Sequence, residues 1–289
     1  MKTSVKLPAG ACDAHVHVFR PDVYSFARDR AYTPGRITRS NLSTFLDAHG
    51  LKRVVIVQPS VYSTDNRAMV DALRELGKRR ARGIAVVDID RVEDETLADL
   101  DAAGVVGIRL NVATREKGNL AKTLRATDKR LAGTNWHIQI YAPMAAIIEA
   151  EKPLSRLGRP VVLDHFGGAR TGQPVVAEGL RVLMRLLRDG PAYAKLSGAY
   201  RVSDDAATQW DDAAPLAVAL IDAAPDRIVW GSDWPHTGSH GRRGAKTRIE
   251  PFQKIDDRAA LAALARWAGE KATLKRILVD TPRELYRFK

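Results

Sequence analysis

The chain has 289 residues, of which 45% are hydrophobic, and a formal net charge of +12 at pH 7. This apolar content supports a large core and excludes a disordered chain. The single cysteine, Cys12, excludes an intramolecular disulfide and a cysteine-rich metal cluster. No stretch approaches the roughly 18 apolar residues of a membrane span, and the first residues lack the apolar segment of a secretory signal. We therefore expect a cytoplasmic protein without a membrane partner.

The positive charge is spread along the sequence. Two basic clusters, at residues 78–82 and 242–246, are short and are typical of solvated surfaces or loops. No nucleic-acid-binding motif accompanies them, so we do not expect a nucleic-acid partner. A positive field also draws small anions into a cleft, which makes an anionic small molecule the more natural ligand.

Apolar, β-rich runs alternate with helical patterns along the whole chain. The first run covers residues 13–19 and precedes a polar loop and a short helix at 41–49. Helices are also predicted near 63–79, 93–103 and 120–132, from Pro143 onward, and toward the C-terminus. Seven further strands are predicted at 53–58, 83–88, 104–111, 136–141, 160–165, 192–197 and 227–230.

Eight strands separated by helical segments predict an α/β protein, a (β/α)8 TIM-type barrel formed by residues 1–289 as a single domain. The alternative is a doubly wound open sheet. Such a sheet normally has a glycine-rich phosphate loop after its first strand, and this sequence has none there.

Polar residues gather where the predicted strands end. In a barrel these ends share one mouth, where active sites lie. Each residue alone has an ordinary structural explanation, as a buried histidine or a turn aspartate, but together they favour a functional site. Those at strand ends are His15, His17, Ser60, Arg109, Asn111, Tyr141, His165, Ser197 and Asp233, and Arg115 and Arg201 follow in loops just beyond.

These residues resemble the metal-site motifs of the amidohydrolase superfamily. A closer resemblance, to the subfamily of 2-pyrone-4,6-dicarboxylate lactonases, runs along most of the chain. It rests on Asp13-Ala14-His15-Val16-His17, Tyr32-Thr33-Pro34, Val57-Gln58-Pro59-Ser60, Thr64-Asp65-Asn66, Gly83-Ile84-Ala85-Val86-Val87-Asp88, Gly107-Ile108-Arg109-Leu110-Asn111, Leu163-Asp164-His165-Phe166-Gly167 and Trp230-Gly231-Ser232-Asp233-Trp234-Pro235-His236.

The sequence departs from the metal-dependent members of the superfamily. They typically carry a lysine or glutamate at the end of strand four and a histidine at the end of strand five, where this chain has Arg109, Asn111 and Tyr141. This argues against a binuclear centre. A single divalent ion such as zinc could still be held, with an open position, by His15, His17, His165 and Asp233. The resemblance implies that the reaction needs no metal ion, because the pyrone lactonases are regarded as working without one. We expect that no metal is required.

Lactone opening needs a base that activates water and positive charge or donors at the developing oxyanion. Asp233 is the expected base, with a pKa raised by partial burial. His15, His17 and His165 would polarise the lactone carbonyl in place of a metal. The expected carboxylate-binding residues, which also fall where the resemblance places substrate arginines, are Arg109, Arg115 and Arg201. Further hydrogen bonds are expected from Tyr141, Ser60 and Tyr32.

The leading hypothesis is a hydrolase that opens a small anionic substrate, a carboxylated lactone or pyrone similar to 2-pyrone-4,6-dicarboxylate. Within enzymes, a sugar-acid lactonase or lactone isomerase of the same subfamily is an alternative, and so is a zinc-dependent decarboxylase. A non-catalytic anion-binding barrel is a further alternative, against which the retention of every proposed catalytic group argues. The sequence leaves the oligomeric state and the exact lactone open.

Overall fold

The computed structural model describes residues 5–112, 120–205, 209–238 and 248–289. Its main sheet has eight parallel strands in the order β1-β3-β4-β5-β6-β7-β8-β9. The strands are β1 (Cys12–Val16), β3 (Arg53–Val57), β4 (Ala81–Ala85), β5 (Val105–Asn111), β6 (His137–Tyr141), β7 (Val161–Leu163), β8 (Ala192–Ser197) and β9 (Ile228–Gly231).

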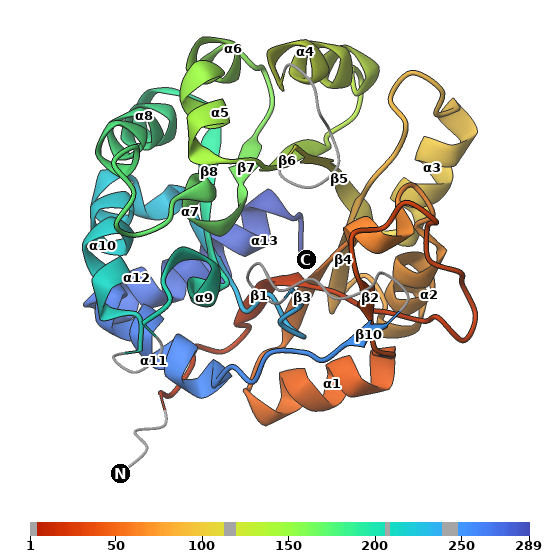
Figure 1. Cartoon of the computed structure of the whole chain (residues 1–289), viewed down its shortest axis with the longest axis horizontal. Helices are drawn as coiled ribbons and strands as arrows, with labels where there is room; N and C mark the ends of the chain where they lie inside the picture. Colours follow the sequence, from red (N-terminus) through yellow and green to blue (C-terminus); the bar gives the residue numbers. More distant parts are fainter. Residues whose placement is uncertain (1–4, 113–119, 206–208, 239–247) are drawn as a thin grey trace.

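Helices follow the strands and surround them in a ring (Figure 1). Their apolar residues recur every three or four positions, as Val182, Leu183, Leu186 and Leu187 do in α8, so one face packs on the sheet. The helices are α1 (Arg39–Ala48), α2 (Arg67–Leu76), α3 (Asp94–Ala103), α4 (Leu120–Arg130), α5 (Met144–Glu149), α6 (Glu151–Ser155), α8 (Val176–Asp189), α10 (Ala214–Ala223), α11 (Asp257–Ala268), α12 (Lys271–Lys275) and α13 (Thr281–Leu285).

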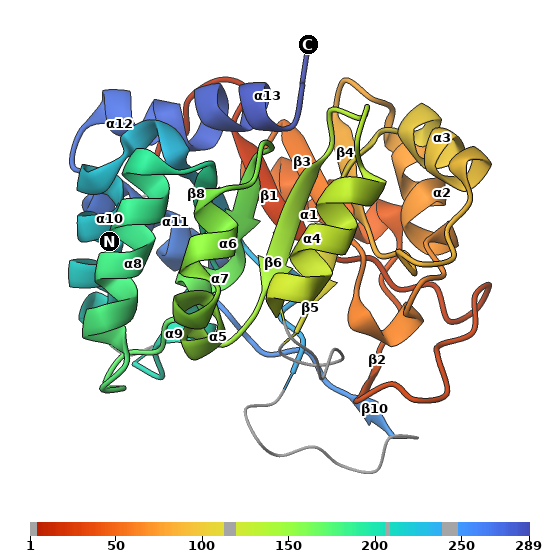
Figure 2. The same ribbon diagram turned by 90° about the horizontal axis from the view of Figure 1, so that it is seen from above.

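Short elements complete the two ends of the barrel. A small parallel sheet pairs β2 (Thr33–Pro34) with β10 (Ile249–Glu250). In Figure 2 this sheet lies at the end opposite α13 and the C-terminus. The remaining elements are η1 (Ser60–Tyr62), α7 (Asp164–Gly168), α9 (Ala199–Val202), η2 (Asp211–Ala213), η3 (Pro225–Arg227) and η4 (Arg276–Asp280).

The first and last strands are joined by hydrogen bonds just beyond their carboxyl ends. The backbone N–H of His17 donates to the carbonyl of Trp234, and that of Asp233 donates to the carbonyl of His15, both at 2.9 Å. Gly231 makes this approach sterically feasible, because a Cβ there would lie 2.5 Å from the Cβ of His15. The contacts close the sheet into a barrel and place Asp233 beside the histidines.

Side chains alternate between the barrel interior and the surrounding helices. In β3, Val55 and Val57 belong to an interior cluster, whereas Val54 and Ile56 pack in the cluster that the helices cover. Tyr286, which follows α13, joins the interior cluster. The interior is therefore filled with apolar side chains toward the α13 end, and the polar side chains gather toward the carboxyl ends of the strands.

The predicted (β/α)8 barrel is confirmed, with each predicted strand present within a few residues of its expected bounds. The predicted end of the strand at 160–165 is wrong, because β7 ends at Leu163. His165, Phe166 and Gly167 then have positive φ of 50°, 56° and 67°, so the chain leaves the strand through a left-handed turn. The organisation of the chain as one domain stays a prediction. Among the described helices, none has both the length and the apolar character needed to cross a bilayer.

Candidate active site

A cavity opens at the carboxyl ends of the strands. Among the described residues it is lined by His17, Tyr32, Pro59, Ser60, Arg109, Asn111, Tyr141, His165, Arg201, Asp233, Thr237 and Gly238. Two of these side chains are guanidinium cations and one is a carboxylate, so the described wall has an excess of positive charge. The barrel thus gathers residues that are up to 221 positions apart in the sequence, from His17 to Gly238.

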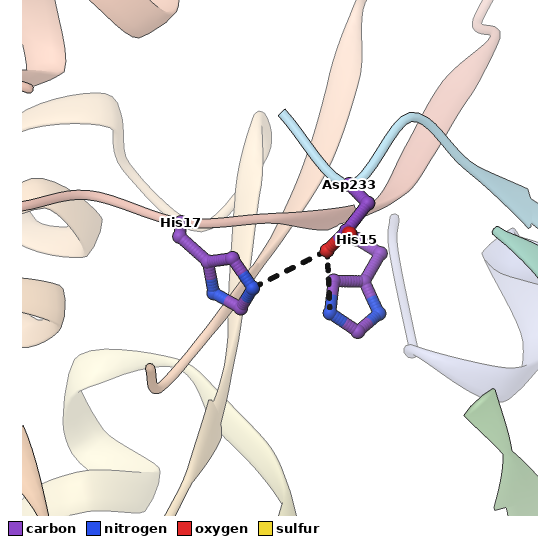
Figure 3. A group of neighbouring side chains, drawn as sticks. All are labelled: His15, His17 and Asp233. Atoms are coloured by element: carbon purple, nitrogen blue, oxygen red, sulfur yellow. Dashed lines mark ion pairs between the residues drawn. The ribbon is translucent and has the colours of Figure 1, made fainter. Parts of the chain in front are cut away.

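Two imidazoles converge on one oxygen of Asp233 (Figure 3). Oδ1 of Asp233 lies 3.5 Å from Nε2 of His15 and 3.4 Å from Nε2 of His17. The two-residue spacing brings both rings to the same side, as predicted. A register shift between Asp13 and Val16 contributes, since Ala14 also belongs to the interior cluster and strict alternation would have turned His15 outward.

The other oxygen of Asp233 is held by two donors. The Tyr200 hydroxyl donates to Oδ2 at 2.5 Å, and Nε of Arg201 donates to the same oxygen. Burial opposes ionisation of Asp233, but the Arg201 guanidinium outweighs it and holds the pKa of Asp233 well below its usual range. The expectation of a raised pKa is therefore wrong, because it left out this ion pair. Asp233 is a carboxylate at neutral pH, with Oδ1 as its open oxygen.

His165 lies on the turn after β7, beside β8. Its Nδ1 is 3.2 Å from the carbonyl oxygen of Ser197 and 3.0 Å from the hydroxyl of the same residue. The ring meets that of Tyr141 edge to face, with centroids 4.9 Å apart. Burial lowers the pKa of His165 to about 4, so this imidazole is neutral at physiological pH.

Arg109 projects from β5 into the cavity wall. Its Nε and Nη2 both lie 3.3 Å from Oδ2 of Asp164, and its guanidinium stands over the Tyr141 ring at 5.4 Å. The guanidinium is thus held from one side by a carboxylate and from another by an aromatic face. Tyr32 reaches the same wall, where its hydroxyl lies 3.4 Å from Oγ1 of Thr237.

A polar layer beneath the cavity was not predicted. It consists of Gln139 from β6, Asp164 after β7 and Lys195 from β8, with side chains that are buried completely or nearly so. A signal was present in the sequence, since Gln139 is in phase with Tyr141, and Lys195 with Ser197, within otherwise apolar strands. Tyr200, the donor to Asp233, was also missed.

The structure brings together nearly all of the predicted site residues. His15 lies directly beside the cavity-lining residues, and the others are in its wall: His17, Ser60, Tyr32, Arg109, Tyr141, His165, Arg201 and Asp233. Arg201 was expected in a loop and instead lies on the short helix α9. Ser60 begins η1. The predicted substrate residue Arg115 lies outside the described residues.

The spacing of the nitrogen and oxygen atoms would suit one divalent ion. Zinc bonds of about 2.0–2.2 Å in a tetrahedral site place ligand atoms roughly 3.4 Å apart, close to the two distances from Asp233 to His15 and His17. His15, His17 and Asp233 therefore form a group that could hold one metal ion. The contacts of Nδ1, the second ring nitrogen of His15, do not fit metal binding. A metal-ligating histidine normally donates its second N–H to a carboxylate or carbonyl. Nδ1 of His15 is instead hydrogen-bonded to the Lys195 ammonium at 3.4 Å, and the Asp164 carboxylate oxygen at the same distance forms no hydrogen bond with it within the described residues.

Curated relatives match almost the whole chain. A 2-pyrone-4,6-dicarboxylate hydrolase of Comamonas testosteroni is 32% identical and covers 99% of this chain and 92% of its own length. A 4-sulfomuconolactone hydrolase of Rhizobium radiobacter is also 32% identical, over 98% of this chain and 92% of the relative. A D-galactarolactone isomerase of Agrobacterium fabrum is 27% identical, over 97% and 92%.

A solved structure supports the same relationship. The crystal structure of a probable 2-pyrone-4,6-dicarboxylic acid hydrolase from Acinetobacter baumannii, with citric acid bound, superposes with a TM-score of 0.78 at 26% identity. The match covers 96% of this chain and all of that one. The amidohydrolase family model matches residues 12–288. The resemblance inferred from the motifs is thus confirmed, and this chain belongs to the amidohydrolase family.

Proposed function

We propose that this protein is a hydrolase that opens a carboxylated lactone or pyrone, with Asp233 as the base that activates water. The observation that carries the proposal is the asymmetry of the Asp233 carboxylate. Oδ2 is held by Tyr200 and Arg201, whereas Oδ1 has no hydrogen bond within the described residues and faces the histidines. The ion pair keeps this carboxylate ionised, and its open oxygen is positioned to accept a proton from a bound water as the water attacks.

The reaction follows from this arrangement. Oδ1 of Asp233 takes a proton from water as the water oxygen bonds to the lactone carbonyl carbon. The negative charge that develops on the carbonyl oxygen is stabilised by an N–H donor of the imidazole cluster that His15, His17 and His165 form. When the ring C–O bond breaks, the leaving oxygen takes the proton from Asp233. One water is consumed, and a hydroxy acid is formed. In this proposal no metal is required.

The substrate is an anion. Arg109 and Arg201 line the cavity, and guanidinium groups bind carboxylates through paired N–H donors. The names of two relatives, a pyrone dicarboxylate hydrolase and a sulfomuconolactone hydrolase, describe lactones with acidic substituents. Tyr141, Ser60 and Tyr32 supply further hydrogen bonds to the substrate, and Arg115 completes the set of substrate arginines.

A second candidate is a sugar-acid lactonase, or a lactone isomerase in which a substrate hydroxyl takes the place of water. The similarity to a D-galactarolactone isomerase favours it, as do the polar side chains of Asn111 and Thr237 in the cavity wall. A hydrolase and an isomerase differ in the product, which is an open hydroxy acid for either hydrolase and a second lactone for the isomerase.

A substrate panel tests both candidates. Carboxylated pyrones, sulfonated lactones and aldaric lactones are compared with neutral analogues in which the acid groups are methyl esters. Proton release reports hydrolysis, and chromatography of the products detects isomerisation. We expect kcat/KM for an acidic lactone to exceed that for its neutral analogue at least about 100-fold, the size of one or two lost charge-assisted hydrogen bonds. Equal values for the acidic and neutral lactones would contradict the proposal.

A further inference from the structure

Lys195 is a buried cation that the proposed reaction does not use. It projects from β8 into the barrel beneath the cavity, and its side chain has no exposed surface. Its Nζ lies 2.7 Å from Oε1 of Gln139, 3.2 Å from Oδ1 of Asp164 and 3.4 Å from Nδ1 of His15. An ammonium group has three N–H donors and no acceptor, and here it has three neighbours that are able to accept.

The neighbours of Lys195 are themselves fixed. The amide nitrogen of Gln139 donates to Oδ2 of Asp164 at 3.0 Å, which turns its Oε1 toward Lys195. The same Oδ2 is approached by Arg109. The orientation of each group is thus determined by a partner that can only donate or only accept. The network holds the ammonium in place below His15.

This contact determines which nitrogen of His15 carries the proton. Nδ1 accepts from Lys195 only when it is unprotonated. The other group near Nδ1 is Oδ1 of Asp164 at 3.4 Å, which forms no hydrogen bond with this nitrogen within the described residues and pairs with the Lys195 ammonium at 3.2 Å. A neutral imidazole carries one N–H, so this arrangement places the His15 proton on Nε2, the nitrogen that faces Asp233.

His17 has the opposite arrangement. Its Nδ1 lies 2.7 Å from the carbonyl oxygen of Val57, and a carbonyl can only accept, so Nδ1 donates. In the neutral ring Nε2 then carries a lone pair. Both Nε2 atoms face Oδ1 of Asp233, but when both rings are neutral one offers a proton and the other an electron pair. The two histidines of the motif are therefore not equivalent.

We propose that Lys195 is a positioning residue that fixes the tautomer of His15, so that His15 presents an N–H to the carbonyl oxygen during lactone opening. The inference rests on the proposed function for the role of that N–H, but the tautomer itself is independent of the substrate. The same contact opposes metal binding, because a ring protonated at Nε2 has no lone pair there. Without Lys195, Asp164 would accept from Nδ1 and free Nε2, as in the carboxylate–histidine pairs of metal sites.

The tautomer is measured directly by nitrogen-15 NMR of wild-type protein labelled in its histidines. The His15 signals are assigned by their loss in His15→Gln. We expect Nε2 of His15 to have the shift of a protonated nitrogen and Nδ1 that of an unprotonated one, with the reverse pattern in His17. A proton on Nδ1 of His15 overturns the proposal. Because no substrate is involved, this result is unaffected if the proposed lactonase activity is absent.

The substitution Lys195→Met removes the ammonium and keeps the length of the side chain. We expect the His15 proton to move to Nδ1 and kcat to fall about 100-fold, while KM changes less than about threefold. Zinc affinity, measured by calorimetry, should rise about tenfold or more. An unchanged tautomer, or an unchanged kcat in a folded variant, overturns the proposal. If the variant fails to fold, the wild-type spectrum decides.

The matched control is Arg82→Met. Arg82 is also a buried cation on a barrel strand, but it donates to backbone carbonyls of Ala81 and Arg287 near the C-terminal residues. Its removal should lower stability and leave the His15 tautomer, the zinc affinity and kcat as in the wild type. A loss of kcat in Arg82→Met as large as in Lys195→Met would show that removing any buried cation has this effect, and would overturn the assignment to Lys195.

Discussion

The substitution Asp233→Asn tests the proposed base with almost no change of shape. Oδ2 of Asp233 faces two donors, Tyr200 and Arg201, so the amide oxygen of the variant takes that position. The amide NH2 then occupies the position of Oδ1 and points toward His15 and His17. A proton acceptor at the reacting water is replaced by a donor, while the cavity keeps its volume.

The size of the effect follows from the lost chemistry. A positioned general base contributes about 10²–10⁴ in rate, so we expect kcat to fall roughly 1000-fold, which is about 4 kcal/mol in the activation free energy. Binding should not weaken, because Arg201 no longer shares its charge with Asp233 and is free for a substrate carboxylate. The loss of the ion pair should cost about 2 kcal/mol of unfolding free energy, since Arg201 is 21% exposed and keeps its bond to the Thr237 carbonyl.

Steady-state kinetics on the best lactone of the panel, calorimetric binding of a non-reacting dicarboxylate and urea unfolding measure these quantities. The matched control is Tyr200→Phe, which removes one hydrogen bond to Oδ2 and leaves Oδ1 as a base. It should reduce kcat far less than Asp233→Asn. If Asp233→Asn keeps a kcat within about threefold of the wild type, well below the usual contribution of a general base, Asp233 is not the base.

Further predictions concern the substrate-binding arginines, the metal requirement and the buried His137. Arg109→Met and Arg201→Met should each raise KM for a dicarboxylate about tenfold or more, the value of one charge-assisted hydrogen bond, and indifference of KM in both would mean that neither binds a carboxylate. Dialysis against a chelator should leave kcat unchanged, whereas stoichiometric zinc by elemental analysis with chelator-sensitive activity would contradict a metal-free reaction. Burial lowers the pKa of His137 from 6.5 to about 3; between these values the unfolded chain binds more protons, so stability is lost as pH falls through this window. The contribution is about 1.4 kcal/mol per pH unit. Urea unfolding of His137→Leu should show a flatter pH dependence there, and an unchanged slope would refute the assignment to His137.

The sequence by itself predicted the barrel and most of its mouth. Eight apolar runs separated by helical patterns indicate parallel strands covered by helices, and the absence of a glycine-rich loop after the first strand favoured a barrel over a doubly wound sheet. The position of a residue at a strand's end then places it at the mouth. This is why His17, Arg109, Tyr141 and Asp233 could be placed together without a structure.

Only the tertiary structure decided how these groups are paired. Arg201 was assigned to the substrate alone, and its contact with Asp233 reversed the expected direction of the pKa shift. Lys195 looked like one polar residue in an apolar strand, and its neighbours are Gln139, from another strand, and Asp164, which follows a third. A strand pattern indicates which side chains face the interior, but charges interact over a few ångströms across strands. The protonation and tautomer of each group therefore depend on contacts that the order of residues does not contain.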